Sequence, residues 1–283
     1  MVREVESSAI HNKLMPRWPL PNPIPHSIRC SFRSLAGHCI GLRARCCSCA
    51  RAKAGEADLG QLAGLGGSLA KNHCRVFWSK PLGQAHDPAL LAQWSRLDAP
   101  RPILDGRFRS RPGVFAWDRI DPASALLVEH LPKDIVGHGA DLGAGYGYLS
   151  AEVLARCPRV TGLDLYEAES RALELARENL SAIDSPARRE FLWHDVTTGV
   201  PQRYDFVVTN PPFHTQSRAD RPDVGRRFIA VAAEALKPGG KLWLVANRHL
   251  PYEESLGEAF GQVRTLGERD GFKVIEAVKA ARR

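Results

Sequence analysis

The amino-acid sequence predicts an α/β fold in which a doubly wound, mostly parallel seven-stranded sheet ends in an antiparallel hairpin. After residue 137, short apolar runs alternate with amphipathic stretches of helical period, as expected for a parallel sheet covered on both faces. The last two apolar runs are separated only by a turn, so we expect them to pair as a hairpin at one edge. A glycine-rich turn between the first strand and the following helix completes the pattern.

Each element of the sheet is recognised by its period and its boundaries. Seven runs have the length and composition of strands: 139–142, 160–165, 190–193, 206–209, 241–245, 263–268 and 272–278. Four segments have the period of helices that bury one face: 148–156, 167–182, 223–236 and 252–259. A further helix is predicted after Asp121-Pro122, because Asp caps a helix N-terminus and Pro fits its first turn.

The region before the sheet domain, which we assign to residues 100–283, divides into two parts. Residues 1–55 are predicted to be a small, basic, partly disordered leader, because residues 7–55 contain eight basic residues, no Asp or Glu, and five prolines between Pro16 and Pro25. A targeting peptide or a wrongly assigned start codon would leave a similar composition. Residues 56–99 are predicted to form a small subdomain, with a strand at 74–78 and a helix that begins at Asp87-Pro88.

The overall composition is that of an ordinary globular protein, with 283 residues, 44% hydrophobic and 25% charged. No apolar run approaches the roughly 20 residues that span a bilayer, and the N-terminus lacks the pattern of a secretory signal, so we expect a cytoplasmic protein. Residues 1–111 carry 17 basic and 7 acidic side chains, whereas the remainder carries 22 and 24. This asymmetry favours a polyanionic partner such as nucleic acid, the alternative being a basic leader with no partner.

The cysteines indicate reduced thiols and no metal site. Six of the seven precede residue 75, and an odd number on a chain without a secretory signal is typical of the cytosol. Cys46, Cys47 and Cys49 lie close together, but they lack the paired spacing of zinc fingers or ribbons. We therefore predict no metal ligand.

The glycine-rich turn has the sequence Asp141-Leu142-Gly143-Ala144-Gly145-Tyr146-Gly147. Glycine at this position lets backbone approach a ligand closely. The dinucleotide fingerprint needs Gly or Ala where this chain has Tyr148, which argues against a pyrophosphate-containing cofactor. A tight strand-to-helix turn without a ligand is the structural alternative.

Two acidic residues follow at the predicted ends of the next strands. Asp164 lies 23 residues after Asp141, where a carboxylate can accept both hydrogen bonds from a ribose diol. Asp195 follows the third strand, where it can accept a hydrogen bond from an adenine amine, with Val196 against the ring. A helix cap for Asp164 and a turn for Asp195 are the alternatives.

The sequence Asn210-Pro211-Pro212-Phe213 follows the fourth strand and suggests the chemistry most directly. Two prolines fix the backbone, so the Asn210 side chain and the Pro211 carbonyl can present two acceptors at a set separation to a planar NH2 group. Holding both amine hydrogens directs the nitrogen lone pair towards an electrophile, while Phe213 offers a face for a flat base. Asn-Pro also occurs as a simple turn.

The sequence resembles the class I S-adenosylmethionine-dependent methyltransferases that act on exocyclic or amide nitrogen, through DLGAGYG, the Asp164 acid, HDV and NPPFH in this order. These methyltransferases have a Rossmann-like fold. Through GVFAWDRID, NPPFHTQ and ANRHLPYE, residues 100–283 resemble more closely the bacterial 16S ribosomal RNA guanine-N2 methyltransferases. That family has two tandem methyltransferase-like domains. The present chain departs from this pattern, because only residues 56–98 could be the end of a first domain.

The resemblance implies transfer of a methyl group from S-adenosylmethionine to the N2 amine of a guanine in small-subunit ribosomal RNA. It implies cofactor contacts from Asp141, Gly143, Ala144, Gly145, Tyr146, Gly147, Asp164, Leu165, Asp195 and Val196. The catalytic residues would be Asn210, Pro211, Pro212 and Phe213, with Phe213, His214, Arg218 and Arg221 contacting the substrate. A guanine in structured RNA would have to be flipped out to reach the cleft.

The implied partner is ribosomal RNA or the 30S subunit, acted on by a monomer. Large-subunit guanine, adenine N6 and protein glutamine N5 remain alternative acceptors, since the same Asn-Pro-Pro acceptors suit each of them. A catalytically silent RNA-binding module is the alternative of a different class. The arginines after the NPPF motif border the expected position of the base, although solvated surface arginines would look the same in sequence.

Overall fold

The computed structural model describes residues 43–46, 49–71, 74–80, 87–212 and 222–281. The chain divides into two compact units, Met1–Ala99 and Pro100–Arg283. Within the described ranges, no helix is both long enough and apolar enough to cross a bilayer.

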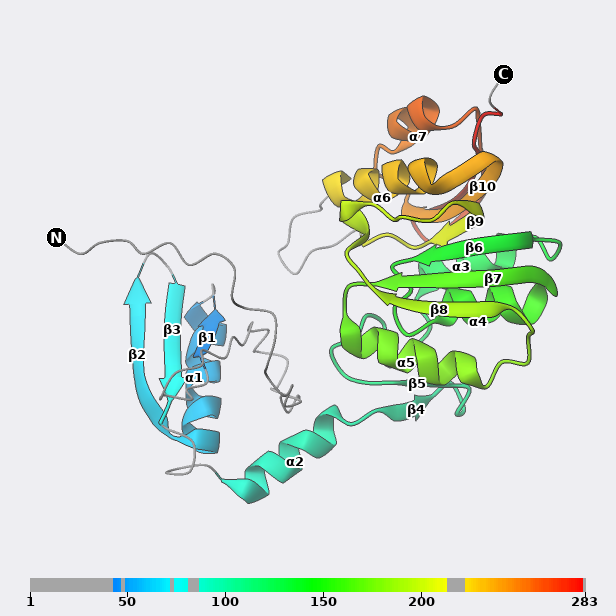
Figure 1. Ribbon diagram of the computed structural model, residues 1–283. Coiled ribbons are helices and arrows are strands. Elements are labelled where there is room, and N and C mark those ends of the chain that lie inside the picture. The colour runs from blue at the N-terminus through cyan, green and yellow to red at the C-terminus, as the bar shows by residue number, and fades with distance from the viewer. Residues whose placement is uncertain (1–42, 47–48, 72–73, 81–86, 213–221, 282–283) are drawn as a thin grey trace. The chain divides into compact units, whose positions relative to one another are not determined.

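The first unit contains a small antiparallel sheet and two helices (Figure 1). Its elements are β1 (Arg43–Cys46), α1 (Cys49–Ala63), β2 (Leu65–Lys71), β3 (Cys74–Ser79) and α2 (Pro88–Asp98), with strand order β1-β3-β2. Leu59 and Ala63 of α1 pack on Phe77 of β3. The leader predicted over 1–55 is too long, because β1 and half of α1 precede residue 56. Alanine alternates with Arg and Lys there, a composition that favours helix.

The second unit has the predicted fold, which is thereby confirmed. Its elements are β4 (Arg101–Ile103), β5 (Phe108–Ser110), α3 (Pro122–His130), β6 (Val136–Leu142), α4 (Tyr148–Arg156), β7 (Arg159–Glu167), α5 (Ser170–Ser181), β8 (Arg188–Trp193), η1 (Val196–Thr198), β9 (Tyr204–Thr209), α6 (Pro222–Ala235), β10 (Leu236–Asn247), α7 (Glu253–Ala259), β11 (Gln262–Arg269) and β12 (Phe272–Val278). The sheet order is β11-β12-β10-β9-β6-β7-β8. Strands β8, β7, β6, β9 and β10 pair in parallel, and β12 pairs antiparallel with both β10 and β11.

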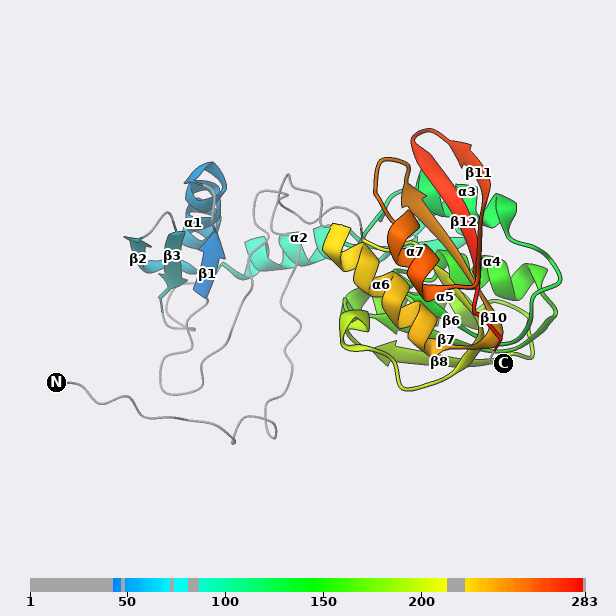
Figure 2. The same cartoon turned by 90° about the horizontal axis from the view of Figure 1, so that it is seen from above.

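Helices cover both faces of this sheet. On one face, α3, α4 and α5 contribute Leu127, Val153 and Ala176 to the core, and on the other α6 and α7 contribute Ile229 and Leu256. Figure 1 shows α6 and α7 on one side of the strands and α5 on the opposite side. In Figure 2 the β11–β12 hairpin stands at the edge of the sheet. The helices and their two apolar layers cover the faces of the sheet, so the carboxyl ends of the parallel strands are bordered by loops.

The register of the central strands determines which loops meet. Leu142, the last residue of β6, pairs with Thr209 of β9 on one side and with Tyr166 of β7 on the other. Gly139 of β6 pairs with Phe206 of β9, and a Cβ atom on Gly139 would come within 2.1 Å of the Phe206 ring. Glycine at this position therefore leaves room for the ring. The glycine-rich turn consequently lies between the end of β7 and the Asn-Pro-Pro sequence that follows β9.

The segment before the sheet contains a hairpin of β4 and β5, which is not among the elements predicted from the sequence. Asn179 of α5 accepts a 2.7 Å hydrogen bond from the Arg109 N–H and donates a 3.0 Å bond to the Arg109 carbonyl. The same side chain donates a 2.8 Å bond to the Tyr146 carbonyl. One buried amide therefore connects the hairpin, a core helix and the glycine-rich turn.

Candidate active site

The glycine-rich turn after β6 presents open backbone at the carboxyl edge of the sheet. Gly143, Gly145 and Gly147 have φ angles of 77°, 57° and 91°, a left-handed conformation that favours glycine. A Cβ atom on Gly145 would meet no atom within 4 Å, so the space beside the turn is open. The Gly145 N–H donates a 2.8 Å hydrogen bond to Oε2 of Glu167, which fixes the turn against the end of β7.

Asp141 is a buried acid beside this turn. It is 0% exposed, and the Ser150 hydroxyl donates a 2.7 Å hydrogen bond to its Oδ2. Its Oδ1 is also buried and accepts no hydrogen bond from the residues that the structure describes. Burial raises the pKa of Asp141 to about 7, although the Ser150 bond acts in the opposite direction. A buried acceptor without a donor costs about 1–3 kcal/mol, so Oδ1 suits an N–H or ammonium group of a ligand.

Asp164 does not lie at the end of its strand, as the sequence suggested, because β7 continues for three residues to Glu167. Asp164 is 1% exposed, and the Tyr204 hydroxyl donates a 2.8 Å hydrogen bond to its Oδ2. Nε2 of His138 lies 3.0 Å from its Oδ1. Both carboxylate oxygens are thus engaged inside the sheet. Leu165 is equally buried, at 0%, within the apolar core. Neither side chain is placed to contact a ligand at the strand end.

Glu167 has the position expected for the ribose-binding acid. It is the last residue of β7, and its carboxylate accepts hydrogen bonds from the backbone of Gly145 (2.8 Å) and Glu169 (2.7 Å). Burial is the largest influence on this half-buried carboxyl group and raises its pKa above the ordinary value. An acid held by backbone beside the glycine-rich turn can accept hydrogen bonds from a diol without a change of conformation.

Asp195 follows β8 and caps the short helix η1. Its Oδ1 accepts hydrogen bonds from the Thr197 N–H (2.9 Å) and hydroxyl (2.7 Å), and these bonds lower the pKa of Asp195. Both bonds end on Oδ1, so Oδ2 can accept a bond from a ligand amine. Val196 is 3% exposed and packs in the core, so its side chain does not offer the apolar face predicted for a ring.

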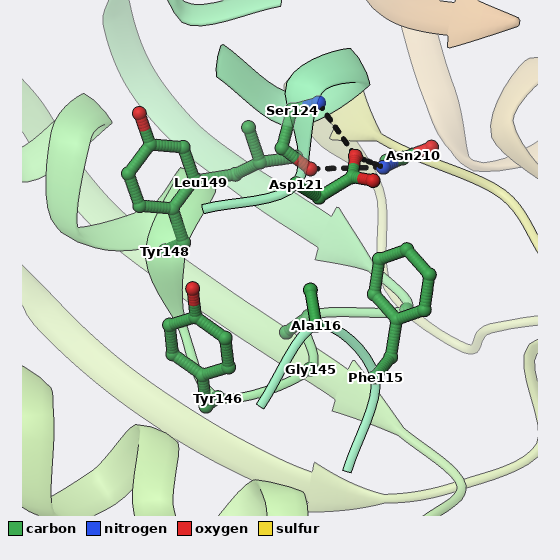
Figure 3. A pocket seen from close by; sticks show the side chains of 11 residues that line it. Phe115, Ala116, Asp121, Ser124, Gly145, Tyr146, Tyr148, Leu149 and Asn210 are labelled. Carbon is green, nitrogen blue, oxygen red and sulfur yellow. Dashed lines mark hydrogen bonds between the residues drawn. The ribbon is translucent and has the colours of Figure 1, made fainter. Parts of the chain in front are cut away.

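Asn210 follows β9, and its amide is held by hydrogen bonds to α3. Nδ2 donates to Oδ2 of Asp121 and to Oγ of Ser124, each at 2.8 Å. Figure 3 shows these two bonds, with the amide oxygen of Asn210 on the side away from both acceptors. Pro211 is buried and Pro212 is exposed. The other predicted substrate contacts, Phe213, His214, Arg218 and Arg221, lie outside the described residues.

A pocket lies between the glycine-rich turn and the loop that leads into α3. It is lined by Phe115, Ala116, Asp121, Ser124, Gly143, Ala144, Gly145, Tyr146, Tyr148, Leu149 and Asn210. Phe115 is 66% exposed, an unusual environment for a large apolar ring, and its side chain lies near Asn210 in Figure 3. Ala116, with a φ of 48°, produces the tight bend after it. The predicted glycine-rich turn and Asn210 therefore meet at one pocket.

Four residues of this region were missed or only partly interpreted from sequence. Asp121 was interpreted as a helix cap, and the structure shows that it is one. Its hydrogen bond with Asn210 was not predicted, because the two residues are 89 positions apart in the sequence. Ser124 gave no signal beyond its place just after that cap, and Phe115 entered only as part of the GVFAWDRID motif. Glu167 could have been found if the apolar run had been extended through Tyr166, since an acid then ends the strand.

The sheet order, with the reversed strand β12 between β10 and the edge strand β11 and with both ligand-facing turns at the carboxyl ends, is the architecture of the class I methyltransferases. Residues 105–276 match the family model described as "Methyltransferase small domain". The chain belongs to this family, and the family predicted from its motifs is confirmed.

Individual relatives refine the comparison. The chain is 39% identical over 212 residues to "Ribosomal RNA small subunit methyltransferase C" of Pseudomonas paraeruginosa, a match that covers 72% of this chain. It is 35% identical over 209 residues to the Alcanivorax borkumensis protein of the same name, and this match covers 73% of this chain. The T. thermophilus 16S rRNA N2 methyltransferase RsmC, solved with AdoMet and guanosine, is 31% identical with a TM-score of 0.61, covering 78% of this chain and 59% of that one. The chain spans about 60% of the length of these curated relatives.

Proposed function

We propose that this protein transfers a methyl group from S-adenosylmethionine to the N2 amine of a guanine in small-subunit ribosomal RNA. The observation that carries the proposal is the orientation of Asn210, which lines the pocket beside the glycine-rich turn with its amide oxygen turned away from Asp121 and Ser124, the two acceptors that hold its nitrogen. The similarity to proteins named as small-subunit ribosomal RNA methyltransferases supports RNA as the acceptor. The solved relative carries AdoMet and guanosine, which supports this pair of ligands.

The residues at the strand ends fit the cofactor. The buried Oδ1 of Asp141 would accept a hydrogen bond from the ammonium group of the methionine part, and Glu167 would accept bonds from the ribose diol. Asp195 would accept a bond from the adenine amine through Oδ2. The ribose contact would thus move from Asp164, which is 1% exposed, to Glu167, which is half-buried at the end of β7.

The protein's contribution to the reaction is alignment of the amine. When bound, S-adenosylmethionine would supply an electrophilic methyl group, its sulfur keeping the electron pair of the broken carbon–sulfur bond, and the methylated amine would release a proton to water. Asn210 Oδ1 and the Pro211 carbonyl would hold the two amine hydrogens and so direct the lone pair. Such positioning supplies most of what a reactive methyl donor requires from its enzyme.

Methyl transfer from labelled cofactor tests the function directly. We expect label in naked 16S RNA or in 30S particles, and in the N2 position of guanine after digestion to nucleosides. Large-subunit RNA and a release-factor-like protein are the comparison acceptors. Label at adenine N6 or in a glutamine side chain would show that guanine is not the acceptor. No transfer to any of these acceptors would favour the catalytically silent RNA-binding module.

The affinity for S-adenosylmethionine should depend on pH through Asp141. Because its pKa in the unliganded protein is raised to about 7, the cofactor's ammonium meets a largely protonated carboxyl group below that pH. We expect affinity to rise as the pH increases towards 7, by up to about tenfold per pH unit, and then to level off. Calorimetry from pH 5.5 to 7.5 measures this dependence, and Asp141→Asn should flatten it.

The raised pKa of Asp141 also predicts how the stability of the unliganded protein depends on pH. Between about pH 4 and pH 7 the folded state holds a proton on Asp141 that the unfolded chain has released, so the contribution of this group to stability falls as the pH rises. Asp141→Asn should remove that part of the pH dependence of thermal unfolding. An affinity that is equal at pH 5.5 and 7.5 in the unmodified protein would contradict the proposed role.

Phe115 should contribute to binding of the target base. Its exposed ring lines the same pocket as Asn210, so the loss of the ring in Phe115→Ala should remove a stacking contact, worth roughly 1–3 kcal/mol for a nucleic-acid base. We expect KM for RNA to rise about tenfold, with cofactor affinity unchanged. Phe115→Tyr keeps the ring and is the control. Equal KM values for the alanine and tyrosine variants would remove Phe115 from the base site.

A further inference from the structure

The hydrogen bonds that hold Asn210 come from a part of the chain distant in sequence. Nδ2 donates to Oδ2 of Asp121 and to Oγ of Ser124, each at 2.8 Å and 86 or more residues away. Both acceptors belong to the first turn of α3, where Asp121 is the N-cap. Figure 3 shows the three side chains together at the edge of the pocket. Asp121 and Ser124 thus form a pair of acceptors, here called the Asn210 clamp.

The chemistry of the clamp determines which end of the amide faces the pocket. An ionised carboxylate can only accept hydrogen bonds, so the amide nitrogen of Asn210 must face Asp121. The reversed amide would place its oxygen against the carboxylate and would lose the hydrogen bond. The Ser124 hydroxyl can donate or accept and would tolerate either orientation. Asp121 is therefore the residue that decides where the Asn210 oxygen points.

The clamp is held in place by the helix that carries it. Oδ2 of Asp121 also accepts a 2.8 Å hydrogen bond from the Ser124 N–H, which is the capping bond of α3. Pro122 occupies the first turn and restricts the backbone there. Leu126 and Leu127 of α3 are 2% and 0% exposed and anchor the helix in the core. The carboxylate consequently has little freedom to move when a ligand enters the pocket.

We propose that Asp121 is a positioning residue for methyl transfer and that Ser124 assists it. The clamp holds the Asn210 amide before the substrate binds, so its oxygen and the Pro211 carbonyl are already placed to accept the hydrogens of the target amine. Such preorganisation affects the rate of the chemical step more than it affects cofactor binding. This inference rests on the proposed function, because the target amine belongs to it.

Asp121→Asn is the decisive variant. Asparagine is an equally good helix cap and has nearly the same size, but its own amide can present either a donor or an acceptor to Asn210. The Asn210 amide would then populate both orientations. We expect kcat for methyl transfer to fall by roughly tenfold to a hundredfold, with the KM for S-adenosylmethionine and the thermal midpoint close to those of the unmodified protein.

A matched control exists in the other unit of the chain. Asp87 caps α2, is also followed by proline, and accepts hydrogen bonds from the backbone of Ala89 and Leu90 at 2.9 Å. Asp87→Asn therefore reports the effect of the same exchange at a cap that has no role in the pocket. Ser124→Ala, which removes only the second acceptor, should lower kcat less than Asp121→Asn does.

A spectroscopic measurement makes the test independent of turnover. In the intact clamp both Nδ2 protons of Asn210 are donated, so its side-chain amide should give two well-separated NMR signals with slow hydrogen exchange. The signals are assigned by their loss in Asn210→Ala. In Asp121→Asn we expect the exchange to become faster and the signals to broaden or move, and in Asp87→Asn we expect no change.

The outcomes separate the inference from the function on which it rests. A kcat for Asp121→Asn equal to that of Asp87→Asn, or unchanged Asn210 signals, would overturn the clamp. If Asp121→Asn does not fold, unchanged kcat and unchanged signals in Ser124→Ala would also overturn it. If the unmodified protein methylates no guanine, the proposed function fails, and the Asn210 signals alone decide whether the clamp exists.

Discussion

Asn210→Ala is expected to lower methyl transfer by about a hundredfold or more while S-adenosylmethionine binds with unchanged affinity. The substitution removes the amide oxygen that would hold the target amine, and an acceptor misplaced by 1 Å can already cost about a hundredfold in rate. In the proposed site no cofactor atom is assigned to Asn210, so the loss should fall on kcat. Single-turnover transfer to RNA and calorimetry with the cofactor measure the two quantities separately.

The control for this variant is an asparagine at the end of the adjacent strand. Asn247 ends β10, and its Oδ1 accepts a 3.2 Å hydrogen bond from the His249 N–H. It has the same side chain at the same edge of the sheet but is not among the residues that line the pocket. Asn247→Ala should therefore retain most of the activity. Near-normal turnover by Asn210→Ala on RNA would show that the acceptor mechanism is wrong.

Glu167→Gln should weaken S-adenosylmethionine binding by at least about tenfold with little effect on folding. Hydrogen bonds to a charged group are worth roughly 1.5–3 kcal/mol each, and the ribose diol would lose the charge of its acceptor. The amide oxygen of Gln can still accept the bond from the Gly145 N–H, so the glycine-rich turn should keep its conformation, while the amide NH2 group would lose the bond from the Glu169 N–H. Calorimetry and thermal unfolding of the same samples measure affinity and stability.

Asp164→Ala is the comparison for Glu167→Gln, and the opposite result is expected. Removing the buried carboxylate breaks its bonds with the Tyr204 hydroxyl and His138, at a total cost of about 1–3 kcal/mol, because the Tyr204 hydroxyl still has the Tyr166 hydroxyl 2.7 Å away. The thermal midpoint should fall, while the folded fraction should bind the cofactor normally. A large loss of affinity at Asp164 with none at Glu167 would restore the original assignment of the ribose acid.

The fold could be predicted because its signals are local. Each parallel strand is a short apolar run, and a helix such as α5 shows its buried face through residues three or four apart, including Ala172, Leu175 and Ala176. The hairpin of β4 and β5 was missed because its strands have only three residues each. Its turn places Leu104 and Asp105 at positive φ angles, which sequence does not suggest for leucine.

The site was predicted in part, and the errors have one physical cause. The glycine-rich turn and Asn210 lie where the sequence placed them, because each directly follows a strand whose end is clear. The end of β7 was not clear, since the helical period of the following segment assigned Glu167 to the helix predicted over 167–182. Whether an acid is buried among partners or exposed at a strand end depends on residues far away in sequence, such as Tyr204 for Asp164.

The three hydrogen bonds of Asn179 define where the catalytic unit begins. A fragment that starts at β6, the first strand of the sheet, would contain every side chain that we assign to the cofactor. It would nevertheless lack the Arg109 backbone, whose N–H and carbonyl pair with the same amide that holds the Tyr146 carbonyl. The hairpin is thus part of the support of the glycine-rich turn, and the structural unit that holds this turn begins upstream of the sheet.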